Sequence, residues 1–418
     1  MLVRFYRRMR NARIRRRRLK TNPRWVIHAG IHQRTTGASE AFARSVRRAF
    51  DILDVPRSVV NVDRLIDTLE SLAARPSDHR DASAYWRDTL AAIPAGSLQH
   101  RQWRWLSQIS GMMGLFRATD VARLKSAEML TLGPPDRDAA PDGVLYASAL
   151  LLLGRTAEAA EWLAARRAVD PESIAVGVAA HFATRLLHGS SSDTRVPDTV
   201  GLDGHLSRLR PIVEGRSVAI IGNSKALTAT AVPDDVEVVV RLNAFKILDR
   251  AADQIHAGRR LVVYMNSGQS GRLLAESNDC TPAADALTKR SSLIALRATP
   301  PAGAPHTFTN PRVAPPIHDH GPVIGNQAVF DCVVCGASSI QLVGFDFNQT
   351  SLIDETPWQM CRKLGDQGSL NQFQFARSLR EEGLLRADAI GNRALSLDPT
   401  QYASLLEDLY GDWSTPRT

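Results

Sequence analysis

The sequence predicts an α/β fold: a parallel sheet in the second half of the chain, preceded by an all-α, repeat-like domain. Apolar residues recur at helical spacing in the first half, whereas short apolar runs alternate with helical stretches in the second. A polar stretch of Ser, Asp and Pro separates the halves. We therefore expect a basic, flexible tail (1–40), a helical domain (41–188), a linker (189–204) and an α/β domain (205–418).

The excess of basic over acidic residues comes from the tail. Residues 1–24 contain eleven Lys and Arg and no acid, so the formal net charge of +9 becomes −2 for the rest of the chain. Such a tail can be a solvated arm, which is the favoured interpretation, or can contact an anionic membrane or nucleic acid. We expect no nucleic acid partner. Neither a spanning segment nor a secretory signal is recognisable, which favours a cytoplasmic protein with peripheral contact at the inner membrane as the further option.

The helical domain is predicted from two apolar stripes and from one stretch of small residues. The stripes are Phe42, Val46, Phe50 and Leu53, then Val62, Leu65, Leu69 and Leu72. From Tyr146 to Pro171 the small residues resemble a tetratricopeptide repeat, in which two antiparallel helices approach closely. A plain helical bundle is the alternative. In both cases we expect this domain to pack against or recruit a partner.

The four cysteines of the chain fit a reducing compartment. Cys332 and Cys335 form a C-x-x-C, but no second pair follows at the spacing of a zinc site, and their neighbours are apolar. Free thiols packed in a helix are the favoured interpretation, and a redox pair is the alternative.

The α/β domain is predicted from five apolar runs that end in turn residues. Runs of this kind read as buried strands of a parallel sheet. The expected strands are Ser217–Gly222, Val236–Leu242, Leu261–Met265, Ser292–Leu296 and Ser339–Gly344, and the expected helices include Asn326–Gly336 and Gln372–Glu382.

Glycine and polar residues follow these strands at the point where each one ends. In open α/β sheets, ligands bind outside the carboxyl ends of the strands, and helix N-termini suit anions. We therefore expect a nucleotide at this edge of the sheet. The residues concerned are Gly222, Asn223, Ser224, Arg241, Asn243, Asn266, Gly325, Asn326 and Asp346.

Two of these segments resemble the motifs of sialyltransferases. Val218–Ser224, followed by Val240–Asn243, resembles the long motif of glycosyltransferase family 29, a V-G-N-S turn and then R-x-N. Gly321–Asp346 resembles the short motif, and Gly344–Phe347 is also similar to a segment of the bacterial family 42. The resemblance covers about half of the chain.

The resemblance implies a Rossmann-like sheet of variant GT-A type and a CMP-sugar donor. By this comparison Asn223 and Asn243 hold the CMP, Asn266 faces the donor sugar, Gly325 caps a turn near the phosphate, and Asp346 supports a strand end. The implied reaction is inverting transfer of a sialic-acid-like sugar to a glycan or glycolipid acceptor. Because the leaving group is a monophosphate and no D-x-D motif is evident in the α/β domain, we expect no metal and no cofactor.

The catalytic base is the point at which the sequence departs from these families. They carry a His after the short motif, whereas this chain has no His beyond His320. His320, with its neighbour His318, and Asp366 are the candidate bases. A catalytically inactive nucleotide-binding scaffold is the alternative function. A Rossmann oxidoreductase is disfavoured because Gly222 lacks the partner glycines of G-x-G-x-x-G.

Overall fold

The structure is a computed structural model. It describes residues 39–61, 79–133, 143–189, 204–222, 232–242, 258–265, 293–296, 315–317, 323–349 and 357–411, with single positions in 22–30 and 63–68. The chain forms two compact units. The helical unit comprises Met1–Pro134, Ile353–Leu370 and Pro399–Thr418, and the sheet unit comprises Pro135–Leu352 and Asn371–Asp398.

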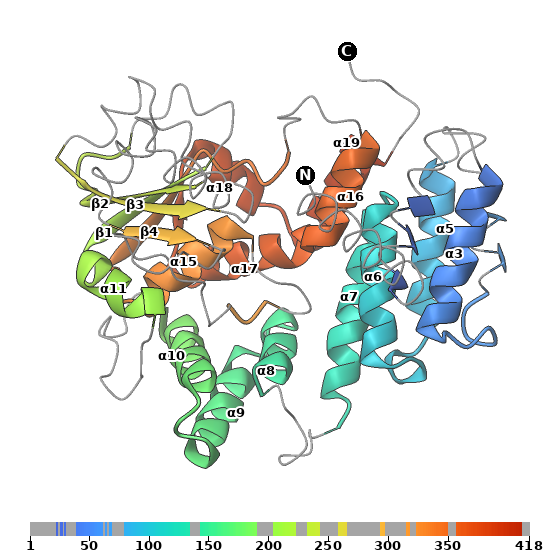
Figure 1. Cartoon of the computed structure of the whole chain (residues 1–418), viewed down its shortest axis with the longest axis horizontal. Helices are drawn as coiled ribbons and strands as arrows, with labels where there is room; N and C mark the ends of the chain where they lie inside the picture. The colour runs from blue at the N-terminus through green and yellow to red at the C-terminus, as the bar shows by residue number, and fades with distance from the viewer. Residues whose placement is uncertain are drawn as a thin grey trace, which may run out of the picture. The chain divides into compact units, whose positions relative to one another are not determined.

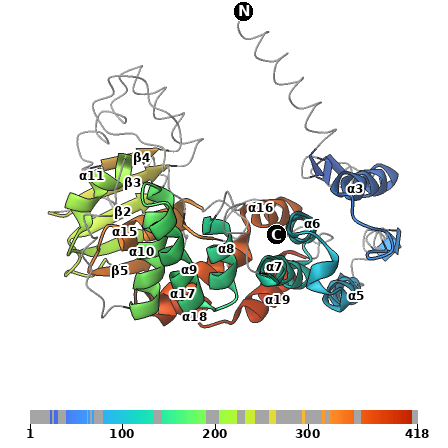
Figure 2. The ribbon, with the colours of Figure 1, turned by 90° about the horizontal axis from the view of Figure 1, so that it is seen from below.

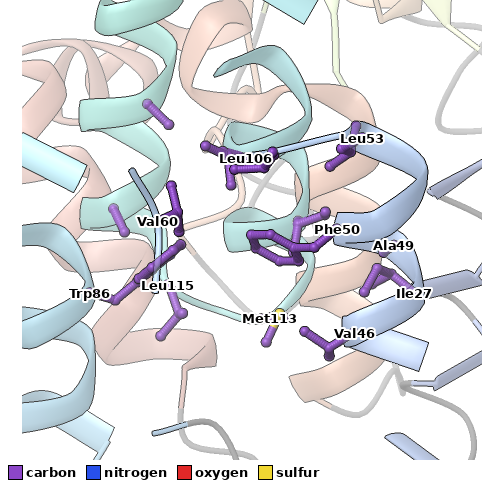
Figure 3. Packing of buried hydrophobic residues seen from close by; sticks show 14 of the residues in the cluster. Ile27, Val46, Ala49, Phe50, Leu53, Val60, Trp86, Leu106, Met113 and Leu115 are labelled. Carbon is purple, nitrogen blue, oxygen red and sulfur yellow. The ribbon is translucent and has the colours of Figure 1, made fainter. Parts of the chain in front are cut away.

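Six helices build most of the described part of the helical unit. They are α3 (Ser39–Leu53), α5 (His79–Ala92), α6 (His100–Met112), α7 (Phe116–Thr131), α16 (Pro357–Gln367) and α19 (Pro399–Tyr410). The predicted stripe on α3 is buried, and Figure 3 shows Val46, Phe50 and Leu53 in one cluster with Leu106 and Met113. The second predicted stripe, Val62 to Leu72, lies outside the described residues.

The first turns of the chain that the structure describes are part of this core. Val26 is 3% exposed and Ile27 is fully buried in the same cluster as α3. The predicted tail of residues 1–40 therefore includes two residues, Val26 and Ile27, that belong to the core. The basic residues 1–20 lie outside the described residues.

Two C-terminal helices also belong to the helical unit. α16 crosses α6 so closely that a Cβ on Gly365 would lie 2.6 Å from the carbonyl carbon of Gly111. On α19, buried Glu407 accepts hydrogen bonds from the backbone and side chain of Arg117 on α7. The boundaries of the units therefore differ from those of the predicted domains. Residues 353–370 and 399–418, which were predicted to belong to the α/β domain, belong to the unit of the N-terminal helices.

The described residues of the sheet unit form a parallel sheet of six strands. They are β1 (Ser217–Ile221), β2 (Val238–Leu242), β3 (Arg260–Met265), β4 (Leu293–Leu296), β5 (Ser339–Val343) and the two-residue β6 (Arg386–Ala387). The five predicted strands are confirmed, with ends within two residues of the expected ones. The α/β class of this region is thereby confirmed.

The sheet reverses its order beside β1. Its strand order is β4-β3-β2-β1-β5-β6, and Figure 2 shows β4, β3, β2 and β5 following one another. The chain thus builds outward from β1 in one direction and then returns to the other side of β1 with β5. In open α/β sheets such a reversal marks the ligand-binding crevice.

Helices cover one face of this sheet. α15 (Ile324–Val334) packs across β1, β2, β3 and β5, and α11 (Gly204–Val213) packs against α15 and β4. α10 (Ile174–His188) packs against α15 (Figure 1). The ring of Phe182 on α10 packs against that of Phe330 on α15, with centroids 5.1 Å apart and planes tilted by 52°. In the part of this unit that the structure describes, the other helices are α8 (Gly143–Leu152), α9 (Thr156–Val169), α17 (Ser369–Glu381) and α18 (Ala389–Leu395). The first two residues of α17 belong to the helical unit.

The predicted small-residue stretch forms closely packed helices. Ala147 and Leu150 of α8 share a core cluster with Ala159 and Leu163 of α9 and with Ala179 of α10. The helical character of residues 143–188 is thus confirmed. In the part of the chain that the structure describes, no helix is both long and apolar enough to cross a membrane.

Candidate functional site

The candidate site is the carboxyl edge of the sheet beside β1 and β5. The amide of Gly222, the residue after β1, donates to the carbonyl of Val343 over 2.8 Å. A Cβ on Gly222 would collide with the carbonyl of Gly344, the residue after β5. Glycine is therefore required here because two backbone segments meet as the strands end.

A phenylalanine ring occupies the space between two of the predicted site glycines. A Cβ would lie 3.0 Å from the ring of Phe345 if it were added to Gly222, and equally if it were added to Gly325 at the start of α15. Phe345 is half-buried. Packing against this ring explains the absence of a side chain at both positions, and the contact of Gly325 with a phosphate stays a prediction.

Asn326 lies at the predicted place, but its amide group is engaged within the protein. Its Nδ2 donates to the carbonyl oxygen of Gln372 over 2.8 Å and to Oε1 of the same residue over 3.0 Å. The backbone amide of Val323 also donates to Gln372 Oε1, over 3.1 Å. Gln372 of α17 thus caps the first turn of α15. Sequence reasoning missed this residue because the pairing joins positions 46 apart.

Asp346 stabilises the turn that follows β5. Its Oδ1 accepts a hydrogen bond from the amide of Asn348 over 3.1 Å, and the side chain is buried. Phe347 and Asn348 adopt positive φ angles of 50° and 62°. An acceptor at this position holds a turn that L-residues adopt reluctantly. The carboxylate therefore supports the strand end, the role that the resemblance implies for it.

Asp388 is a second carboxylate at this edge, and it is not among the predicted site residues. Its Oδ2 accepts from the amide of Gly344 over 2.7 Å, and its Oδ1 accepts from the amide of Gly391 over 2.8 Å. The residue is the N-cap of α18 and ties this helix to the end of β5. An Asp directly before a helical stretch, the usual sign of an N-cap, was the available signal.

Arg241 is a buried arginine one residue before the end of β2. Its side chain is 9% exposed, and its Nη1 has no hydrogen-bond partner among the described residues. Burial lowers the pKa of its guanidinium below the usual value, because the charged form loses its hydration. In register with it lie Ile221 of β1 and Val263 of β3, both aliphatic.

The opposite face of the same strands carries a satisfied polar cluster. The hydroxyl of Tyr264 on β3 donates to Oδ2 of Asp331 on α15 over 2.7 Å, and Gln327 Nε2 donates to its Oδ1 over 2.7 Å. Burial, followed by the nearby Asp331 carboxylate, raises the pKa of the Tyr264 hydroxyl. This cluster fixes α15 against the sheet.

The C-x-x-C thiols lie on the same helix and are buried. Cys332 and Cys335 are free and fully buried, and Cys335 Sγ contacts the carbonyl of Leu206 at 3.6 Å. Burial raises the pKa of both thiols, which disfavours the reactive thiolate. The interpretation as packed thiols is confirmed.

The structure brings together only part of the predicted site. Gly222, Arg241, Gly325, Asn326 and Asp346 lie at the carboxyl edge of the sheet. Asp366, a candidate base, lies on α16, which belongs to the helical unit. The other predicted residues, Asn223, Ser224, Asn243, Asn266 and His320, lie outside the described residues, as does His318.

Among the described residues, no group of three or more His, Cys, Asp or Glu side chains could hold a metal ion. Comparisons of the chain with protein-family models, with curated proteins and with solved structures found no match in any of the three.

Proposed function

We propose that the sheet unit binds a CMP-sugar and that the protein is a sialyltransferase-like glycosyltransferase with a Rossmann-like sheet of variant GT-A type. The reaction is metal-independent, inverting transfer of a sialic-acid-like sugar to a glycan or glycolipid acceptor. The repeat-like helices α8–α10 recruit a partner or the acceptor, and the basic tail holds the protein at the anionic inner membrane.

One observation carries the proposal. The strands that bear the resembling motifs, β1, β2 and β5, are direct neighbours in the sheet, and β1 and β5 flank the reversal of strand order. Gly222 and Gly325, which belong to the two motifs and are about 100 residues apart in the chain, therefore lie at the same carboxyl edge of the sheet. A nucleotide placed there would contact the ends of all three strands.

The second candidate function is a nucleotide-binding scaffold without catalysis. It is favoured by one observation: Asp366, one of the two candidate bases, belongs to the helical unit and not to the sheet unit. Transfer requires a base that removes the proton of the acceptor hydroxyl. Both functions therefore predict nucleotide binding, and only the transferase predicts turnover of the CMP-sugar.

The test is to incubate the full chain with a panel of CMP-sugars and glycan acceptors and to measure CMP release. We expect release, and we expect Asn223→Ala to lower it roughly tenfold through the loss of a hydrogen bond to the nucleotide. Asn61→Ala in the helical unit is the matched control and should leave it unchanged. His320→Ala and Asp366→Ala then identify the base, because loss of a base lowers kcat and spares CMP binding.

CMP binding without release in the presence of any acceptor would favour the scaffold. Absence of both binding and release, with Asn223→Ala behaving as the unaltered chain, would refute the proposal in both forms.

A further inference from the structure

Arg241 points to the face of the sheet away from α15, and its neighbours in register, Ile221 and Val263, are aliphatic. Side chains alternate along a strand, so Arg241 and Leu242 point to opposite faces. Leu242 points toward α15, since a Cβ on Gly325 would lie 3.5 Å from its Cδ1. Tyr264, in register with Leu242, also reaches α15. The guanidinium of Arg241 therefore lies on the face away from α15.

The carboxylates of the sheet unit that the structure describes near this edge have other partners. Asp331 accepts from Tyr264 and Gln327 on the α15 face. Asp346 and Asp388 accept from backbone amides at the end of β5. Within the described ranges, the charge of Arg241 is thus buried without a counter-ion.

Such an arrangement is unfavourable for the ligand-free protein and favourable for binding an anion. A buried guanidinium without a partner costs folding free energy, and that cost is recovered when an oxyanion accepts its hydrogen bonds. The planar fork of arginine matches phosphate and carboxylate oxygens in two-point contact. Its position one residue before the carboxyl end of β2, beside β1, is the position at which ligands reach such sheets.

We propose that Arg241 is the anion-binding residue of this site and contacts a phosphate or carboxylate group of the ligand. The inference deepens the proposed function and rests on it for the identity of the ligand, because a CMP-linked sialic acid carries both groups. Arg241 then discriminates the charged donor from its uncharged fragments.

The experiment measures binding of matched charged and uncharged probes to the full chain by calorimetry. CMP is compared with cytidine for the phosphate, and N-acetylneuraminic acid with its methyl ester for the carboxylate. We expect the charged member of one pair to bind more tightly, and Arg241→Met to weaken it about tenfold or more while sparing the uncharged member. Arg386→Met, which removes an exposed arginine from β6 of the same sheet, should leave every affinity unchanged.

Urea unfolding without ligand serves as the second measurement. Because Arg241 has no counter-ion among the described residues, Arg241→Met should unfold at the same urea concentration as the unaltered chain or at a higher one. A clearly lower midpoint would mean that Arg241 is paired inside the protein, and that result overturns the inference.

The outcomes separate this inference from the proposed function. If CMP and cytidine bind equally tightly, and the acid and its ester do too, the nucleotide site stands and the role of Arg241 falls. If inorganic phosphate binds in a manner that Arg241→Met abolishes, while cytidine does not bind and CMP binds no more tightly than inorganic phosphate, the anion site stands and the CMP-sugar function falls. If the unaltered chain binds none of these anions, both fall.

Discussion

The helical unit and the sheet unit differ in the partners of some of their buried ionisable side chains. In the helical unit, Asp120 pairs with Arg123 over 2.7 Å, and Glu407 pairs with Arg117 over 2.8 Å. In the sheet unit, Arg241 Nη1 and His181 Nε2 are buried without a hydrogen-bond partner among the described residues.

This difference separates structural polar groups from candidate binding groups. A paired buried ion contributes to a unit that is complete by itself, whereas an unpaired one leaves an interaction to be made by something else. The two buried ion pairs of the helical unit thus complete each other within that unit. The sheet unit keeps a buried guanidinium without a partner among the described residues, at the edge where its strands end.

The largest effect is expected from breaking a buried ion pair of the helical unit. Asp120→Ala removes the acceptor of Arg123, whose side chain is 2% exposed, and also a bond from Thr400. We expect a loss of about 3 to 5 kcal/mol in the free energy of unfolding. Urea unfolding followed by tryptophan fluorescence measures it, because Trp86 and Trp103 lie in this core.

Glu40→Ala is the matched control for this prediction. It breaks the pair of Glu40 with Arg44, whose side chains are 90% and 71% exposed, and exposed pairs contribute less than about 1 kcal/mol. Equal losses in the two variants would contradict the structural role of the buried pair.

A somewhat smaller effect is expected from the unpaired histidine of the sheet unit. Burial, together with Arg185, Arg167 and Arg210, lowers the pKa of His181 from 6.5 to about 4. The unfolded chain therefore binds a proton on this residue below pH 6.5, whereas the folded chain does so only near pH 4. Stability should fall across this window by about 3 kcal/mol as the pH decreases.

His181→Gln should remove this part of the pH dependence, because glutamine does not titrate in the range. Urea unfolding at pH 7, 5.5 and 4 provides the comparison. His188→Gln, at an exposed position on the same helix α10, is the control. The prediction is wrong if the unaltered chain and His181→Gln lose stability in parallel.

The smallest effect compares two helical glycines, one in each unit. Gly365→Ala places a Cβ 2.6 Å from Gly111 at the crossing of α16 and α6 and should cost about 2 kcal/mol. Gly177→Ala, on α10, meets nothing within 4 Å and should stabilise by up to about 1 kcal/mol through higher helix propensity. The melting temperatures of the two variants should therefore move in opposite directions, and shifts of the same sign would disprove a tight crossing.

The strands of the sheet were predictable because their signal is local. A buried parallel strand needs a short continuous run of β-branched and aliphatic residues, and Val238 to Val240 meets that requirement without reference to the rest of the chain. The two-residue β6 was missed since Arg386 and Ala387 form no such run. The domain boundaries differ because no local pattern records which unit a helix such as α19 joins.

The candidate site was predictable only as a set of strand ends. The sequence placed Gly222, Gly325 and Asp346 at one edge, and the structure brings them there. Their partners were not predictable. Phe345 fills the space at both glycines, and Gln372 takes the amide of Asn326, through contacts that depend on side-chain packing across the fold.

The sequence by itself thus determined the α/β class and the identity of the strands, because periodicity and turn residues are properties of short segments. Only the tertiary structure decided the strand order that sets β5 beside β1, the transfer of α16 and α19 to the helical unit, and the burial of Arg241 without a counter-ion. These features arise from contacts between residues that are far apart in the chain. Their energies depend on which partner is present and how much water is excluded, and neither quantity is encoded in a local pattern.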